Sequence, residues 1–186
     1  MNEDYTKDES VLNWSRIYQF MVHFVNQNGL EYGAEIGIAG GKNIRAMLEK
    51  TNIKKIWGVD PHALESWNTG EDPNIFGGLD ALHENVSSSL KEFGDRVELI
   101  RKPSLEGVND FEDDSLDFVF IDALHDYDNV LADIACWSPK VRSGGFVMGH
   151  DYSSDFPGVV RAVRESFANL DIKTHLDIWY VRKETS

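Results

Sequence analysis

Residues 34–41 read AEIGIAGG, in which an apolar run gives way to glycines. This order is typical of a buried strand that turns sharply into a helix, because glycine permits a tight turn and a close approach of backbone amides to a ligand. We therefore predict a strand over residues 34–38 and a helix over residues 43–50. The dinucleotide-binding pattern G-x-G-x-x-G is absent, because Ala39 and Lys42 occupy its second and third glycine positions.

The rest of the chain repeats this alternation of apolar runs and helical stretches. Further strands are predicted at residues 55–59, 96–100, 116–121, 146–148, 172–176 and 178–182, and further helices at 11–28, 79–93, 127–137 and 159–169. Apolar strands separated by amphipathic helices indicate a mostly parallel sheet that is covered on both faces. The fold class is therefore α/β, a doubly wound, Rossmann-like sheet of seven strands, and the consecutive last two strands predict an antiparallel finish.

The length, charge and cysteine content of the chain restrict its domain organisation and its partners. The 186 residues fit one domain, with residues 1–10 as an acidic leader, 11–186 as the domain and 11–29 as its N-terminal helix. The formal net charge of −14 argues against nucleic-acid and anionic-membrane partners. A single cysteine, Cys136, excludes an intrachain disulfide. The first residues do not form a signal peptide and no apolar run could span a membrane, so we expect a cytoplasmic protein.

Acidic residues stand at the carboxyl ends of the predicted strands, where doubly wound sheets bind their ligands. Asp60 ends the second strand about 20 residues beyond the glycine turn, the distance at which an acid accepts hydrogen bonds from ribose hydroxyls. Asp122 and Asp151 end the fourth and fifth strands, and two adjacent carboxylates can chelate a hard divalent cation. The alternative in each case is a helix or turn cap.

Three segments together resemble a known family. Glu35-x-Gly37-x-x-x-Gly41 followed by Asp60 resembles the cofactor site of class I S-adenosylmethionine-dependent methyltransferases. Residues 118–127, FVFIDALHDY, and 144–152, GGFVMGHDY, are similar to metal-dependent small-molecule O-methyltransferases of the macrolide sugar, aminocoumarin sugar and cephalosporin pathways. Catechol O-methyltransferase is a more distant relative. The resemblance extends over about residues 30–183.

This resemblance implies the cofactor contacts. Glu35 and the loop backbone would hold the methionine portion of S-adenosylmethionine, and Asp60 would hold its ribose. The third strand departs from the family pattern, because the acid that often reaches the adenine is missing and Ser104 is only a substitute. The full set implied for the cofactor is Glu35, Gly37, Ile38, Gly41, Asp60, Pro61, Ser104 and Asp122.

The resemblance also implies a metal centre at Asp122, His150 and Asp151. The metal-dependent members of this family often carry an acid at the position of His150. An imidazole there suits manganese, iron, zinc or nickel better than magnesium. We expect magnesium or manganese foremost and leave the identity open. His125, three residues after Asp122, is the candidate general base; alternatively Asp122 or the metal alone lowers the pKa of the acceptor hydroxyl.

We therefore predict metal-assisted O-methylation of a small hydroxylated molecule such as a sugar or a catechol-like diol. A metal-independent N- or C-methyltransferase, or a cofactor-binding protein of the same fold, is the alternative, and an NAD-dependent oxidoreductase is more remote because a glycine is missing. The amphipathic N-terminal helix could serve a homo-oligomer. His62 and His83 are weaker site candidates, and Trp67 is a candidate for a lid over the ligand.

Overall fold

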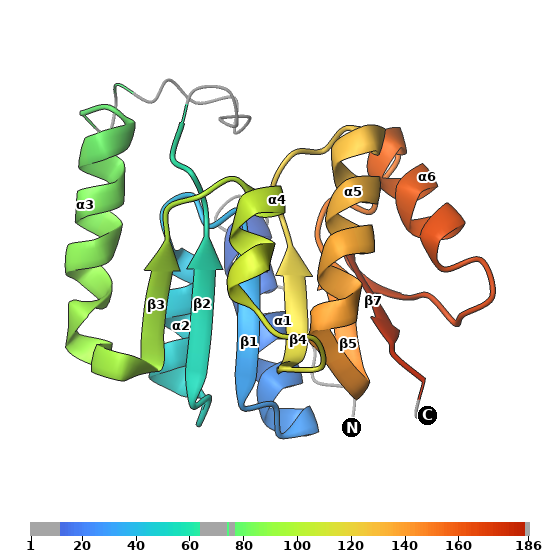
Figure 1. Cartoon of the computed structure of the whole chain (residues 1–186), viewed down its shortest axis with the longest axis horizontal. Helices are drawn as coiled ribbons and strands as arrows, with labels where there is room; N and C mark the ends of the chain where they lie inside the picture. Colours follow the sequence, from blue (N-terminus) through green and yellow to red (C-terminus); the bar gives the residue numbers. More distant parts are fainter. Residues whose placement is uncertain (1–11, 64–73, 75–76, 185–186) are drawn as a thin grey trace.

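The computed structural model describes residues 12–63, 74 and 77–184, and its strands form one sheet in the order β3-β2-β1-β4-β5-β7-β6 (Figure 1). The strands are β1 (Tyr32–Ile36), β2 (Lys55–Val59), β3 (Val97–Ile100), β4 (Leu116–Ile121), β5 (Val141–Gly149), β6 (Lys173–His175) and β7 (Ile178–Arg182). The helices are α1 (Leu12–Asn28), α2 (Lys42–Lys50), α3 (Leu79–Leu90), α4 (Ser104–Gly107), α5 (Tyr127–Trp137) and α6 (Pro157–Ser166). Short 3₁₀ turns are η3 (Lys91–Arg96), η4 (Val108–Asp110) and η5 (Ser138–Lys140).

The strand pairing confirms the predicted fold class. The pairs β1–β2, β1–β4, β2–β3 and β4–β5 are parallel, whereas β7 is antiparallel to both β5 and β6. The order of strands reverses at β1, so that β2 lies on one side of it and β4 on the other. Ligands of doubly wound sheets bind at this switch point, outside the carboxyl ends of the strands.

The sheet packs against its helices through two hydrophobic cores, one on each face. In β4 the side chains of Phe118 and Phe120 enter the core under α1, α2 and α3, while Val119 and Ile121 enter the core under α5 and α6. Figure 1 shows α5 and α6 in front of the sheet and α1 and α2 behind it. Because β4 is buried on both faces, all of its residues except Asp117 are apolar.

Several element boundaries differ from those predicted. The first strand ends at Ile36 rather than at residue 38, because Gly37 turns the chain with a φ of 82°. The fifth strand begins at Val141 rather than at residue 146. The helix predicted to residue 93 gives way to η3 after Leu90, and α4 was not predicted. The acidic leader and Trp67 lie outside the described residues.

The N-terminal helix is part of the core. Met21 of α1 is completely buried, and Phe24 contacts Phe146 of β5 edge to face. This face of α1 is therefore used by the sheet, so only its other faces are available to a partner. In the part of the chain that the structure describes, no helix is both long and apolar enough to cross a membrane.

Candidate active site

The loop between β1 and α2 is fixed to the neighbouring strands. The Gly37 amide donates to the carbonyl of Val59 at 2.9 Å, and the amide of Asp122 donates to the carbonyl of Ile36 at 2.8 Å. A Cβ atom at Gly37 would lie 2.2 Å from the Asp122 carbonyl oxygen, so any larger residue would push β1 and β4 apart. Gly37 is therefore required for the loop to approach the end of β4.

Asp60 binds this loop directly. Its Oδ2 accepts hydrogen bonds from the amides of Ile38 and Ala39 at 2.9 and 3.0 Å, and its Oδ1 accepts from the amide of His62 at 2.7 Å. Ionised carboxylates offer about four acceptor positions, so these three bonds leave room for a further donor. The carboxylate thus has the role of a turn cap and lies where the sequence predicted a ribose contact. Pro61 follows it, with its carbonyl accepting from Arg101 Nε at 3.3 Å.

Glu35 is a buried carboxylate behind the same loop. Its exposed fraction is 3%, and its Oε2 accepts a hydrogen bond from Asn43 Nδ2 at 3.2 Å. Burial, together with the charges of Asp122 and Asp60, raises the pKa of Glu35 well above its usual range, against the hydrogen bond from Asn43. The Oδ1 atom of Asn43 is buried and has no hydrogen-bond partner. A ligand that carries a positively charged donor would satisfy both groups.

Two carboxylates and two imidazoles meet at the ends of β4 and β5. His125 Nε2 lies 2.9 Å from Asp151 Oδ2 and 3.8 Å from Asp122 Oδ1. His150 Nδ1 lies 3.2 Å from Asp151 Oδ1 and 3.7 Å from Asp122 Oδ1. One ligand atom each from Asp122, His125 and Asp151 lies within 4.8 Å of the others, a separation that suits a shared metal ion. The predicted ligand His150 faces the same carboxylates.

The charges of these four groups determine their protonation. Burial lowers the pKa of both imidazoles, but their interactions with the carboxylates of Asp122 and Asp151 outweigh it and raise the pKa of His125 to about 9 and that of His150 to about 10. Burial raises the pKa of Asp151, but its interactions with the two histidines lower it by more. The pKa of Asp151 is therefore below the usual range. In the absence of a cation, the histidines therefore carry the positive charge that the carboxylates require.

Helix capping does not explain the two aspartates. Asp126, not Asp122, caps α5 by accepting from the amide of Asn129 at 3.1 Å, and Phe156 is the N-cap of α6. Asp151 has a φ of 59°, a left-handed conformation that non-glycine residues rarely adopt. Strained backbone of this kind is frequent at functional sites.

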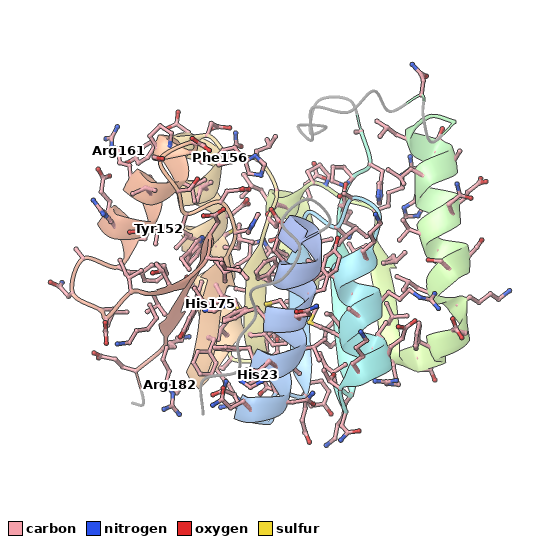
Figure 2. All side chains as sticks on the ribbon, turned by 180° about the vertical axis from the view of Figure 1, so that it is seen from behind. His23, Tyr152, Phe156, Arg161, His175 and Arg182 are labelled. Carbon is pink, nitrogen blue, oxygen red and sulfur yellow. The ribbon has the colours of Figure 1, made fainter. Side chains whose placement is uncertain are left out.

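An aromatic ring borders this cluster. The rings of Phe156 and His125 meet edge to face with centroids 4.9 Å apart. Figure 2 shows Phe156 and Arg161 near the top of the view and His23 near the bottom, toward the other end of the sheet. His175 stacks on Phe20 of α1 at 5.0 Å.

Ser104 is used inside the protein. Its hydroxyl donates to Asp133 of α5 and accepts from Trp137 Nε1 at 2.8 Å, and both partners are buried. A hydroxyl has one hydrogen to donate, so that donor is already committed. An adenine contact of Ser104, which stays a prediction, would therefore have to use the second lone pair of its oxygen.

Two residues near the site were not predicted as functional, and a third was predicted only weakly. Tyr18 of α1 has its pKa raised to about 12 by burial and by the charges of Glu35 and Asp122, which places it in their field. It is half-buried against the core, one turn before the buried Met21, and this helical spacing is the signal that could have found it. Asn43 lies in the first turn of the helix that follows the glycine loop, where amides and side chains face a ligand. His62 was only a weak candidate.

Comparisons with known proteins place this site in context. A family described as "Methyltransferase domain" matches residues 34–152, which is more than half of the chain. The uncharacterized protein R132 of Acanthamoeba polyphaga mimivirus is 25% identical over 161 residues, covering 83% of this chain and 66% of R132. The uncharacterized protein y4gI of Sinorhizobium fredii is 29% identical over 89 residues, covering 48% of this chain and 10% of y4gI. The chain thus spans less than two thirds of both relatives.

Solved structures give the same fold. The O-methyltransferase NovP has a TM-score of 0.66 and 18% identity, with 96% of this chain and 83% of NovP covered. TomG from Streptomyces achromogenes, an O-methyltransferase of tomaymycin synthesis solved in complex with SAM, has a TM-score of 0.63 and 15% identity, with 91% of this chain and 79% of TomG covered. At these identities the likeness establishes the fold.

Proposed function

The chain belongs to the methyltransferase domain family, and from this premise we propose that it transfers a methyl group from S-adenosylmethionine to a hydroxyl oxygen of a small acceptor, with a divalent metal held at Asp122 and Asp151. The observation that carries the proposal is the meeting of these two carboxylates with His125 and His150, close to a glycine loop beside which the buried Asn43 Oδ1 has no hydrogen-bond partner. O-methyltransferases are also among the proteins of the same fold.

The residues around the glycine loop fit the cofactor. S-Adenosylmethionine would supply an electrophilic methyl group on a positively charged sulfur and an ammonium group at its methionine end. Glu35 and Asn43 form a buried acceptor pair, in which the Asn43 oxygen has no partner. A Cβ atom at Gly40 would meet no atom within 4 Å, so the outer side of the loop is open. Asp60 has acceptor capacity left for a ribose hydroxyl.

The residues at the ends of β4 and β5 fit a divalent metal. Asp122 and Asp151 supply hard oxygen ligands, and His150, which precedes Asp151, would be the third ligand. When bound, such an ion would act as a Lewis acid that lowers the pKa of the acceptor hydroxyl and fixes its direction. Among the four side chains His125 and Asp122 are 20% exposed, and His150 and Asp151 are 14% and 12% exposed. The more exposed imidazole, His125, is the one better placed to reach an acceptor.

His125 would take the proton of the acceptor hydroxyl on Nε2. This atom can accept a proton only when the imidazole is neutral, and its raised pKa depends on bonds to Asp122 and Asp151. If a bound cation neutralised these carboxylates, the pKa of His125 would be lower and its Nε2 would keep a free lone pair. Phe156, which contacts the His125 ring, limits the directions from which an acceptor can approach. Positioning of this kind supplies much of the rate enhancement in bimolecular transfer.

Metal and cofactor binding test the proposal without knowledge of the acceptor. Calorimetry should show binding of S-adenosylhomocysteine, and electron paramagnetic resonance should show one tightly bound Mn²⁺ per chain. Asp122→Asn and Asp151→Asn are each expected to weaken Mn²⁺ binding by about a hundredfold, because a charged ligand is replaced by a neutral one. Asp126→Asn is the matched control, since it removes one charge nearby and keeps an N-cap for α5. Equal Mn²⁺ affinity in all three variants would contradict the metal site.

Substitutions of the two histidines are expected to give different results. His150→Ala should weaken Mn²⁺ binding, whereas His125→Ala should keep it and lose methyl transfer. The opposite result would exchange their roles, making His125 the ligand, as the 4.8 Å grouping of its Nε2 with the carboxylates would allow. Asp60→Asn should weaken binding of S-adenosylhomocysteine, and an unchanged affinity would show that the ribose lies elsewhere.

A further inference from the structure

The backbone of Ala39 is held in an unusual conformation at the centre of the glycine loop. Its φ of 42° is left-handed, although alanine has a Cβ atom that disfavours this region. The two backbone polar groups of Ala39 are both bound by the segment that follows β2. Its amide donates to Asp60 Oδ2 at 3.0 Å, and its carbonyl lies 2.9 Å from His62 Nε2. The loop is therefore kept in shape from outside.

His62 is itself fixed on every side. Its side chain is fully buried, and its backbone is left-handed with a φ of 43°. Its amide donates to Asp60 Oδ1 at 2.7 Å, while its Nδ1 lies 3.2 Å from Nδ1 of His83 on α3. Both ring nitrogens therefore have a partner inside the protein. The ring is thus a link between the glycine loop and α3.

The partners assign the tautomer of His62. A carbonyl oxygen can only accept, so Nε2 must carry a hydrogen and donate it to Ala39. In the neutral ring Nδ1 is then an acceptor, and Nδ1–H of His83 is the donor that faces it. Burial lowers the pKa of His83, and this favours a neutral His83.

From these contacts we propose that His62 is a positioning residue for the cofactor, with its tautomer set by His83, which holds Ala39 and so keeps the β1–α2 loop in the conformation that receives S-adenosylmethionine. This inference rests on the proposed function. It differs from the role of Asp60, which holds the amides of the loop, because His62 is the residue that holds a carbonyl. His62 acts through Ala39 and is not expected to touch the reacting atoms.

Two amide substitutions separate this role from simple packing. His62→Gln places an amide nitrogen at about the reach of Nε2 and can still donate to Ala39, whereas His62→Asn places it at about the reach of Nδ1 and cannot. We expect His62→Asn to weaken S-adenosylhomocysteine binding about tenfold in calorimetry, the loss typical of one hydrogen bond with its buried partner left unpaired. His62→Gln should stay within about threefold of the unmodified protein. His23→Gln, on the exposed side of α1, is the control for the substitution itself.

Amide hydrogen exchange gives a readout that needs no cofactor. The peptide that covers residues 37–41 should exchange faster in His62→Asn than in His62→Gln, and His83→Ala should change it in the same direction by a smaller amount. If the unmodified protein does not bind S-adenosylhomocysteine, the proposed function fails, while the exchange comparison still tests His62. Equal exchange in the Gln and Asn variants, or unweakened binding in His62→Asn, overturns the positioning role. If the Asn variant does not fold, unchanged exchange in His83→Ala overturns it.

Discussion

Replacing Asp133 by asparagine should stabilise the protein at neutral and alkaline pH. Asp133 is 4% exposed and accepts a hydrogen bond from Ser104. Burial raises its pKa from 3.8 to about 6, against the hydrogen bond from Ser104. This rise corresponds to about 3 kcal/mol of unfavourable free energy once the carboxylate is ionised in both states.

The pH window follows from the sign of this shift. Because the folded-state pKa is raised, the contribution of Asp133 to stability is intact below about pH 4 and is lost as the pH rises through about 6. The asparagine oxygen can still accept from Ser104, but its new N–H₂ group would leave a hydrogen bond unmade, at a cost of about 1 kcal/mol. We therefore expect a net gain of about 2 kcal/mol at pH 8.

Urea unfolding of both proteins between pH 4 and 8 measures this gain directly, because the other groups titrate alike in each. For a chain of this size 2 kcal/mol corresponds to a rise of about 4–8 °C in the melting temperature. The advantage of the asparagine variant should shrink toward pH 4. A difference that does not change with pH, or a variant that is less stable at pH 8, would refute the account of Asp133 as a buried charge.

Other predictions concern the opposite end of the sheet, the α4–α5 contact and the histidine cluster. Asp117→Ala should lower the free energy of unfolding by about 2–5 kcal/mol, because the amides of Glu31 and Tyr32 and the Arg142 guanidinium lose their acceptor; a loss below about 1 kcal/mol would contradict this. Ser104→Ala should cost about 1–3 kcal/mol in urea unfolding and leave S-adenosylhomocysteine binding unchanged, whereas a large loss of affinity would restore its adenine role. In metal-free protein the stabilisation from His125 and Asp151 should be full between about pH 4 and 6.5 and fade as the pH rises through about 9, and a melting temperature that does not respond to His125→Gln would argue against it.

Several strands were predictable because most of their residues are apolar. The predicted bounds of β2, β4 and β7 equal those observed, since each is a compact run of β-branched and aromatic residues. The start of β5 was missed, because Gly144 and Gly145 are typical of a loop. In the structure Gly145 stays in the strand, where a Cβ atom would lie 2.5 Å from the carbonyl oxygen of Asp117. Such a requirement arises from a neighbouring strand and leaves no local pattern.

The site was predictable to the extent that topology determines it. Asp122 and Asp151 end adjacent parallel strands, so their meeting follows from strand order alone. The role of Ser104 could not be predicted in this way, since its partners lie 29 and 33 residues further along the chain. His62 was only a weak site candidate, because the carbonyl that it binds belongs to a segment 23 residues earlier. Side-chain partners that depend on tertiary contacts remained beyond sequence patterns.

The dependence of methyl transfer on a divalent metal tests the central claim most directly. The protein would be incubated with S-adenosylmethionine labelled in its methyl group and with catechol and sugar acceptors, first as purified, then with EDTA, and finally with Mn²⁺ restored. We predict label on an acceptor oxygen, a loss of about a hundredfold or more in EDTA, and recovery with Mn²⁺. Label transfer at an undiminished rate in EDTA would contradict the metal-assisted mechanism at Asp122 and Asp151.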